Sequence, residues 1–485
     1  MKKFFYKIIA NITAGITTLL LIFSCDDSLN TTSETSLSSA SIFETTERIE
    51  ALVNGAYKSL KSSDLYSGRL LHCNDLRGEE FICLTENSLG GGYAWQQNLS
   101  STTGEVNSIW TQAYRVINNA NILIDGLAKS EEGLISDELK RNYTGEVRLL
   151  RALAYFTLVT TYARPYIDNN GNNKGVPLRL KPESTSANND LERSDVSVIY
   201  QQIINDLDTA ELFLPEKYST ALLNTTRAHK NTAIALKTRV YLSKHDFAKV
   251  REEARKIVAQ NQPPFSAASG VEHRLHDDIT TIFSSDYTTT ESIFSMPMSA
   301  SDPPSGSVLA TVYNSAPNYA LNHTEPGILS NIEWKDTDAR RQFVRQKDDL
   351  FYLTKYSKVS PAIDYIPVVR YAEVLLNYAE AEARGGDLNK AIALLQAVRH
   401  RSDADYSFPA NSLTQAEILN TIRIERRIEL LGEGFRTTDV LRDLLTFPDK
   451  PSRSSYTSRE VGPDDEGYVF PLPNNEILTN KLLLQ

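Results

Sequence analysis

The 485-residue sequence has little cysteine and no excess of positive charge. Its three cysteines are too few for a disulfide framework, which excludes the small disulfide-stabilised secreted folds. Lys and Arg number 51 against 61 Asp and Glu, so we expect neither nucleic acid nor an anionic lipid surface as the main partner. Hydrophobic residues make up 41% of the chain, enough at this length for a large buried core. The composition therefore predicts a globular protein.

Motifs of catalysis and nucleotide binding are also missing. The sequence has no Walker loop, no HExxH or GxSxG motif and no nucleotide fingerprint. One polar run has two histidines a helical turn apart and is the only candidate metal site that stands out: Glu272, His273, His276, Asp277 and Asp278. Because this run matches no known ligand motif, we interpret it as exposed polar residues and expect neither a metal nor a cofactor.

The first 27 residues have the pattern of an export signal. A basic start precedes an apolar run over 14–23 that is too short to span a bilayer, and Ser24 stands directly before Cys25. A cysteine in this place can carry several acyl chains, which hold a protein on a membrane without a spanning helix. The segment resembles a bacterial lipoprotein signal, although Ile22 and Phe23 depart from its usual residues. We expect a signal peptide over 1–24 and lipidation of Cys25, with simple secretion as the alternative.

The stretch after the predicted anchor is polar, and no later segment is apolar enough to cross a membrane. Residues 25–41 are dense in Ser, Thr and Asn with little to bury, which is typical of a flexible tether. Two cysteines remain further along, Cys73 and Cys83. They either pair in an oxidising compartment or stay as buried thiols, and their spacing does not decide between these states.

Helical periodicity dominates the rest of the chain. Apolar residues recur at three- and four-residue steps in segments near 46–60, 110–127, 137–162, 199–214, 232–243, 246–259, 370–384 and 388–400. The last two segments meet at Gly385-Gly386-Asp387, where the glycines can supply a left-handed cap and the aspartate can cap the next helix. The two predicted helices within 232–259 are likewise joined by a short turn. The sequence therefore predicts a mainly α, tetratricopeptide-like helical-repeat scaffold.

Two segments lack this periodicity, and we expect the ligand site there. Residues 64–105 contain three consecutive glycines, and residues 261–365 are rich in Pro, Ser, Thr and Asn. The expected organisation is an N-terminal helical-repeat region over 42–260 and a C-terminal region over 261–485. Within the second region, the irregular segment 261–365 precedes a helical part at 366–445.

Several segments, in order along the chain, resemble the SusD/RagB family. They are residues 52–57 (LVNGAY), 368–381 (VVRYAEVLLNYAEA), 424–436 (IERRIELLGEGFR), 439–442 (DVLR) and 470–473 (FPLP). Together they span nearly the whole chain after the leader, which makes the set more specific than any one segment.

The resemblance implies a surface lipoprotein of the Bacteroidetes type that binds a nutrient without chemistry. Its implied partner is a SusC-like TonB-dependent outer-membrane barrel, on which the protein would act as a lid. The implied ligand is an oligosaccharide or polysaccharide, less often a peptide. The acidic pair after Cys25 is similar to the export signal that would place such a lipoprotein on the outer face.

Trp95 is the first candidate for ligand contact. Its ring offers a flat apolar face for a pyranose, and the amides of Gln97 and Asn98 can both donate to and accept from hydroxyls. Asp75 and Arg77 precede this loop, in a region where the resemblance implies ligand contacts. The alternative is that Trp95 plugs the loop onto the scaffold.

Trp334 is the second candidate, with Tyr313 and Asn314 in the same irregular segment. Trp110 lies on a helical apolar stripe, which favours core packing.

Two other classes of function compete with nutrient binding. Paired carboxylates can hydrolyse glycosides, and the chain has many acidic residues. However, Glu425, Glu429 and Glu433 alternate with arginines at helical spacing, which predicts ion pairs rather than catalysis. A helical-repeat scaffold that presents a concave face to a protein or peptide is the other alternative.

Overall fold

The computed structural model describes residues 41–87, 90–185, 189–284, 289–304, 306, 308–315, 318–406, 408 and 413–485. The predicted signal peptide, Cys25 and the tether up to residue 40 lie outside these residues. Within the described ranges, no helix is both long and apolar enough to cross a membrane.

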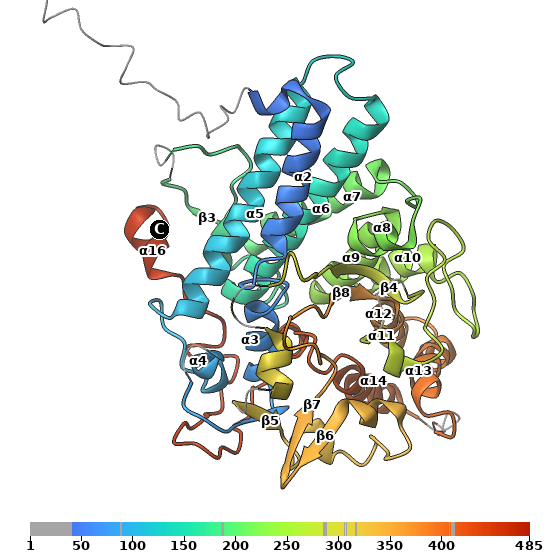
Figure 1. The fold of residues 1–485 in the computed structure, drawn as a ribbon. Helices are drawn as coiled ribbons and strands as arrows, with labels where there is room; N and C mark the ends of the chain where they lie inside the picture. The colour runs from blue at the N-terminus through green and yellow to red at the C-terminus, as the bar shows by residue number, and fades with distance from the viewer. Residues whose placement is uncertain are drawn as a thin grey trace, which may run out of the picture.

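The first helical group is built on two long helices, α5 (Gly104–Lys129) and α6 (Asp137–Tyr162). Both pack against α2 (Thr46–Leu60), and α6 also packs against α7 (Val196–Phe213). Figure 1 shows α2, α5 and α6 side by side. The predicted bounds of α6 are confirmed: the Ser136 hydroxyl caps its start by accepting from the Leu139 N–H at 3.2 Å, and a proline follows its end at position 165.

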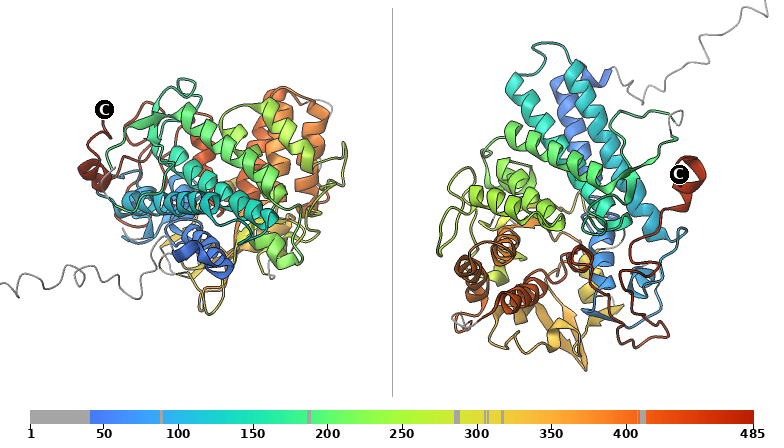
Figure 2. Two further views of the ribbon diagram at one scale, coloured as in Figure 1. Left: turned by 90° about the horizontal axis from the view of Figure 1, so that it is seen from above. Right: turned by 180° about the vertical axis from the view of Figure 1, so that it is seen from behind.

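The second group continues the stack of helix pairs. The hairpin of α9 (Lys230–Ser243) and α10 (Phe247–Ile257) packs against α12 (Tyr371–Ala383), which forms the next hairpin with α13 (Leu388–Ser402). A further helix, α14 (Gln415–Glu429), packs on α12 and α13. Figure 2 shows these pairs from above and from behind. The mainly α, tetratricopeptide-like architecture is thus confirmed.

One predicted detail of this stack is wrong. Neither Gly385 nor Gly386 adopts a positive φ, so the α12–α13 turn has no left-handed glycine cap. Gly386 instead leaves room for the Glu382 carboxylate, which accepts from the Asp387 N–H at 2.9 Å and would have to shift if residue 386 had a Cβ. Asp387 does cap α13, as predicted, by accepting from the Asn389 N–H at 2.9 Å.

Short antiparallel strand pairs lie between the helices, most of them in or next to the two segments without helical periodicity. In the described part of the chain they are β1 (Phe81–Cys83) with β5 (Tyr319–Leu321), β2 (Lys174–Pro177) with β3 (Arg193–Asp195), β4 (Ser292–Met296) with β8 (Ile366–Arg370), and β6 (Val344–Lys347) with β7 (Leu350–Leu353). The β1–β5 pair places Phe81 opposite Leu321 and so joins the two irregular segments. Strands of three to five residues are too short to show a clear alternating pattern, so the sequence signal there is weak.

Short helices complete the structure. They are α3 (Arg69–Arg77), α4 (Gly92–Trp95), α8 (Ala221–Thr226), α11 (Ile279–Ile282), α15 (Arg436–Arg442), α16 (Asn474–Thr479), the 3-10 turns Ser41–Glu44, Ile328–Ser330 and Ala339–Phe343, and a π turn at Thr311–Ser315. The C-terminal α16 lies near β3 and α5 (Figure 1), where the Thr479 carbonyl accepts from the Asn189 amide at 2.7 Å.

Candidate functional site

Asp75, a predicted ligand contact, lies at the end of α3 facing the interior. Its side chain is buried and accepts from the Tyr313 hydroxyl at 2.9 Å and from the Gly434 N–H at 3.0 Å. Burial raises the pKa of the Asp75 carboxyl to about 7, against the lowering effect of these two donors. The structure therefore brings Asp75 and Tyr313 together, as parts of a buried joint.

Arg77, two residues further along α3, is also buried. Its Nε donates to the Gln97 side-chain carbonyl at 2.9 Å, and the Gln97 amide donates back to the Arg77 carbonyl oxygen at 2.6 Å. The guanidinium lies 4.3 Å from the centre of the Phe447 ring and donates to the Tyr468 carbonyl at 3.1 Å. Burial lowers the pKa of Arg77 to about 9. Arg77 and Gln97 thus join α3, the α4 turn and the C-terminal segment.

Trp95 lies fully inside the protein. Its exposed fraction is 0%, and its indole N–H donates to the Phe81 carbonyl at 2.8 Å. The glycine turn before it folds the loop inward: Gly91 has a φ of 90°, and a Cβ there would lie 2.7 Å from a methyl group of Leu76. This position corrects the expectation that Trp95 is a stacking platform for a sugar, because neither ring face meets solvent. The alternative weighed above, a tryptophan that plugs the loop onto the scaffold, accounts for the geometry.

Tyr313 and Trp334, from the second irregular segment, are core residues too. Tyr313 is 1% exposed, and its ring stacks on Phe81 with centroids 4.9 Å apart. Trp334 is 2% exposed and packs beneath the Arg341 guanidinium, 4.4 Å from its ring centre. Asn314 is half-buried, and its side-chain carbonyl accepts from Arg345 at 3.0 Å. For Tyr313 and Trp334 as well, burial corrects the expectation of direct ligand contact.

Apart from Asn98, the exposed side chains of this region are ones that the sequence did not single out. Tyr93 is 39% exposed on α4, and the half-buried Tyr456 packs against the same glycine turn, since a Cβ at Gly92 would lie 2.9 Å from its ring. Burial and the neighbouring Tyr93 both raise the pKa of Tyr456.

Two amide side chains flank this turn. A Cβ at Gly90 would lie 3.1 Å from the Asn87 amide nitrogen and 3.5 Å from that of Asn318. We call the four residues Asn87, Tyr93, Asn318 and Tyr456 the tyrosine surface. Asn98, the one predicted contact that is exposed, lies beside it: its N–H donates to the Tyr93 carbonyl at 3.0 Å.

The sequence analysis singled out the buried aromatic of this loop, Trp95, and not the exposed one, Tyr93. Tyr93 and Trp95 are two residues apart in a four-residue helical turn, so they point in different directions, and both types favour sugars. Tyr93 immediately follows the three glycines, but this position does not show which of the two aromatics faces solvent. Tyr456 has no local signal, because it is more than 360 residues away along the chain.

Comparisons with known proteins decide the family. Residues 27–242 match a family model described as "Starch-binding associating with outer membrane", and residues 310–485 match the model of the SusD family. The crystal structure of a SusD superfamily protein from Bacteroides fragilis is 31% identical with a TM-score of 0.81, over 92% of this chain and all of that one. The chain belongs to the SusD family.

Other SusD-like proteins show the same likeness. SusD-like protein P2 from Formosa agariphila is 27% identical over 100% of this chain and 99% of its own length. A structure named as a laminarin-binding SusD-like protein has a TM-score of 0.69 over 90% of this chain and 98% of that one. Its identity is 20%, so this likeness is one of fold.

Two of the segments that carry the SusD resemblance, 368–381 and 424–436, form a buried ion-pair network together with Arg340. Arg370 bonds to Glu429 at 2.9 Å and to Glu433 at 2.8 Å, and Arg340 bonds to Glu429 at 2.8 Å. The side chains of these residues are 0 to 2% exposed. These carboxylates thus form interhelical ion pairs, as predicted, but with arginines of other elements and not with those at helical spacing in their own segment.

The structure also shows the candidate metal ligands and the two remaining cysteines. Among the described residues, no group of three or more His, Cys, Asp and Glu side chains is arranged to hold a metal ion. Cys73 and Cys83 are both buried and both free thiols, with the Cys83 thiol near the Thr85 carbonyl at 3.2 Å. The spacing of the two cysteines in the sequence did not decide between a disulfide and two buried thiols.

Proposed function

We propose that this SusD-family chain is a cell-surface lipoprotein that binds a glycan without chemistry and delivers it to a SusC-like TonB-dependent outer-membrane barrel. Family membership supports glycan binding, and the name of the laminarin-binding fold neighbour points to the same class of ligand. The proposed processing is removal of residues 1–24 and lipidation of Cys25.

The observation that carries glycan binding is the tyrosine surface. Tyr93 and Tyr456 place two aromatic rings at one glycine turn, where the apolar C–H face of a pyranose can stack. Asn87 and Asn318 add amides that can both donate to and accept from sugar hydroxyls. Aromatic faces bordered by neutral amides suit a neutral polyhydroxylated ligand, and Asn98 extends the polar side of the same turn.

Isothermal titration tests this assignment. Residues 26–485 would be titrated with oligosaccharides of β-glucan and starch type and with peptides. We expect saturable binding of at least one oligosaccharide without product formation. Tyr93→Ala should weaken that binding by about tenfold through loss of ring stacking. Leu212→Ala, a change at a side chain that is 78% exposed on α7, is the control and should bind as the unchanged chain does.

The same titration discriminates between the alternatives. Turnover of a glycan would favour a glycoside hydrolase, and binding of peptides alone would favour a peptide-binding lipoprotein. Binding to no member of the panel would leave a helical-repeat interaction scaffold.

The anchor and the barrel need a separate experiment in cells. Cys25→Ala should leave glycan affinity intact but release the protein from the outer membrane and abolish its contribution to uptake. Crosslinking of the anchored chain should capture a TonB-dependent barrel as a stable partner. Uptake that stays normal with the unanchored variant would contradict the lid role.

A further inference from the structure

An open cavity of about 500 Å³ lies between α5, the segment after β2 and α16. This volume is within the range of about 300 to 1,000 Å³ that is usual for small-ligand sites. Thr111, Arg115 and Asn118 line the cavity from one face of α5, because residues three and four positions apart share a face of a helix. Lys181 lines it from the segment after β2, and Glu476 from α16. We call it the α5–α16 cavity, and none of the described residues that line it belongs to the tyrosine surface.

Hydrogen bonds from α5 hold the wall that the segment after β2 forms. The side-chain carbonyl of Asn118 accepts from the Glu183 N–H at 2.8 Å, and its amide donates to the Glu183 carbonyl at 2.8 Å. The Asn121 amide donates to the main-chain carbonyls of Arg179 and Lys181, both at 3.1 Å. This wall is therefore held by the protein itself, so binding against it costs little conformational entropy.

The charges at this cavity leave two cations without a partner. Arg179 neutralises both carboxylates, since it pairs with Glu183 at 2.7 Å and with Glu476 at 3.5 Å. Arg115 and Lys181 are exposed, and among the residues that the structure describes neither forms an ion pair. Arg115 donates only to a neutral side-chain amide, at 3.0 Å. Three cations thus stand against two carboxylates, in a chain whose net charge is −10, and the cavity favours an anionic ligand.

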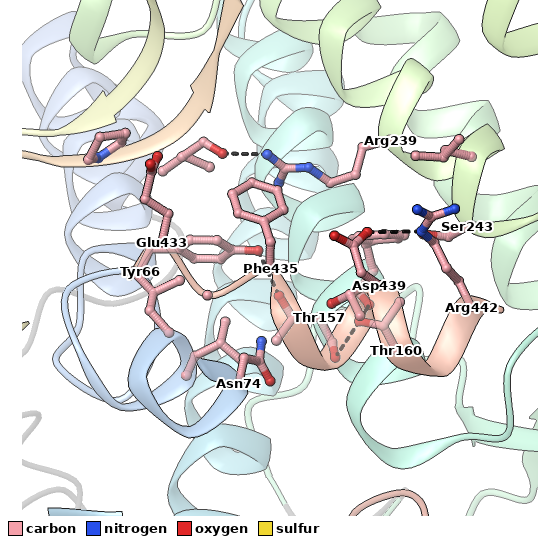
Figure 3. Close-up of a pocket in the computed structure, with 18 of the residues that line it drawn as sticks. Tyr66, Asn74, Thr157, Thr160, Arg239, Ser243, Glu433, Phe435, Asp439 and Arg442 are labelled. Carbon is pink, nitrogen blue, oxygen red and sulfur yellow. Dashed lines mark hydrogen bonds and ion pairs between the residues drawn. The ribbon is translucent and has the colours of Figure 1, made fainter. Parts of the chain in front are cut away.

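The hollow between α3, α6, α9 and α15 differs in both size and charge (Figure 3). Its volume is about 50 Å³, which is room for only a few water molecules. The two arginines labelled in Figure 3 are paired, Arg239 with Glu373 at 2.6 Å and Arg442 with Glu380 at 2.7 Å. It is therefore a gap between packed helices, whereas the α5–α16 cavity can admit a ligand.

Neutral hydrogen-bonding groups lie beside the two free cations. The hydroxyls of Thr111 and Ser184 line the cavity and have no partner within the described part of the chain. A hydroxyl can both donate and accept, which is what the hydroxyl groups of a sugar ring require. The cavity thus combines groups for an acid with groups for a polyol.

We propose that the α5–α16 cavity binds an acidic saccharide, that is, a hydroxyl-rich ring that carries a carboxylate or a sulfate group. Arg115 and Lys181 pair with the acidic group, and Thr111 and Ser184 bond to ring hydroxyls. This inference goes beyond the proposed function, because both the site and the charge of the ligand differ from those at the tyrosine surface.

The test uses the full anchored chain, purified in an uncharged detergent without a sugar headgroup. Saturation-transfer NMR and calorimetry compare glucuronate, galacturonate and the sulfate esters of glucose and galactose with the two neutral parent sugars. At least one acidic probe should bind saturably and about tenfold more tightly than its parent, and added salt should weaken this binding. No binding of any acidic probe, or equal binding of the parent, would overturn the proposal. Inorganic sulfate that binds as tightly as the acidic sugars would overturn the assignment to a saccharide.

Two double variants locate the binding. Arg115→Gln with Lys181→Gln removes both free cations and should weaken binding of the acidic probe by about tenfold. Arg141→Gln with Lys217→Gln is the matched control, since it removes the same charges from exposed side chains that do not line the cavity. The control should bind as the unchanged chain does. An equal loss in the two double variants would show a general effect of net charge and contradict the cavity as the site.

Thr111→Val tests the contact with the sugar ring. It removes one exposed hydroxyl and should weaken binding of the acidic sugar by about threefold without changing the melting temperature. An unchanged affinity would contradict the assigned hydroxyl contact.

The two proposed sites fail separately. Tyr93→Ala should leave binding of the acidic probe unchanged, whereas Arg115→Gln with Lys181→Gln should leave neutral oligosaccharide binding at the tyrosine surface unchanged. If the unchanged chain binds no neutral oligosaccharide, the proposed function fails and a result for the cavity still stands. Binding of the acidic probe that resists the cavity double variant would overturn the cavity and leave the tyrosine surface untouched.

Discussion

The side chain of Gln97 forms two hydrogen bonds with one residue, Arg77: its carbonyl accepts from Nε at 2.9 Å, and its amide donates to the main-chain oxygen at 2.6 Å. This reciprocal pair holds the α4 turn against α3 and so sets the position of Tyr93, four residues earlier. The exposed part of the loop, where we propose ligand contact, thus depends on buried residues for its position.

Replacing Gln97 should therefore destabilise the protein strongly. Gln97→Ala leaves the Arg77 Nε buried without an acceptor, and we expect a loss of about 2 to 4 kcal/mol in the free energy of unfolding. Denaturant titration measures this loss. Gln96→Ala, which removes one bond from a half-buried side chain to the Gly92 carbonyl at 3.1 Å, is the control and should cost less than about 1 kcal/mol.

Substitutions at Trp95 and Tyr93 should change different properties: the first should lower stability and the second should lower ligand affinity. Trp95→Ala empties a fully buried site and should cost about 3 to 5 kcal/mol of stability. Tyr93→Ala should leave the melting temperature unchanged and reduce oligosaccharide affinity. Melting curves and titrations on both variants check this pair. A Trp95 variant that folds normally yet loses affinity would show that the ring does meet the ligand.

Substitutions in the ion-pair network around Glu429 should destabilise the protein strongly. Glu429→Ala leaves the guanidinium groups of Arg340 and Arg370 short of a buried partner, and we expect a loss of about 3 to 5 kcal/mol. Glu252→Ala breaks an exposed pair with Lys249 and should cost less than about 1 kcal/mol. Equal effects in denaturant titrations of the two variants would contradict a structural role for the network.

His72 should make the fold sensitive to acid. Burial, and then the charge of Arg69, lowers the pKa of His72 to about 3, below its usual value of about 6.5. The unfolded chain therefore binds the proton first as the pH falls through the window between these values, so stability decreases with decreasing pH. At pH 5 this group alone should cost about 2 kcal/mol relative to neutral pH.

The His72→Leu variant isolates this effect from that of Asp75, whose raised pKa works in the opposite direction. Its stability should fall less than that of the unchanged chain between pH 7 and pH 5. Parallel pH profiles for the two proteins would show that His72 is not the titrating group.

The long helices could be predicted from the sequence because their signals are local. Ser136 caps the start of α6 and Pro165 follows its end. The apolar residues between them recur at helical spacing and fit no other periodicity. The predicted left-handed glycine cap at Gly385-Gly386 failed because helix ends depend on what packs beside them, here the Glu382 carboxylate against Gly386. The exposed aromatics could not be predicted: whether Tyr93 or Trp95 faces solvent depends on the direction of one turn, and Tyr456 reaches that turn only through the tertiary fold.

The Asp75 carboxylate also determines when folding can be completed. Its hydrogen-bond partners, Tyr313 and Gly434, follow it by 238 and 359 residues along the chain. The end of α3 therefore cannot reach its native surroundings until nearly the whole polypeptide is available, and closing such long loops is slow. A chain that stops before residue 434 can still form local helices such as α5 and α6, but it leaves this joint open and its apolar neighbours exposed to aggregation or proteolysis.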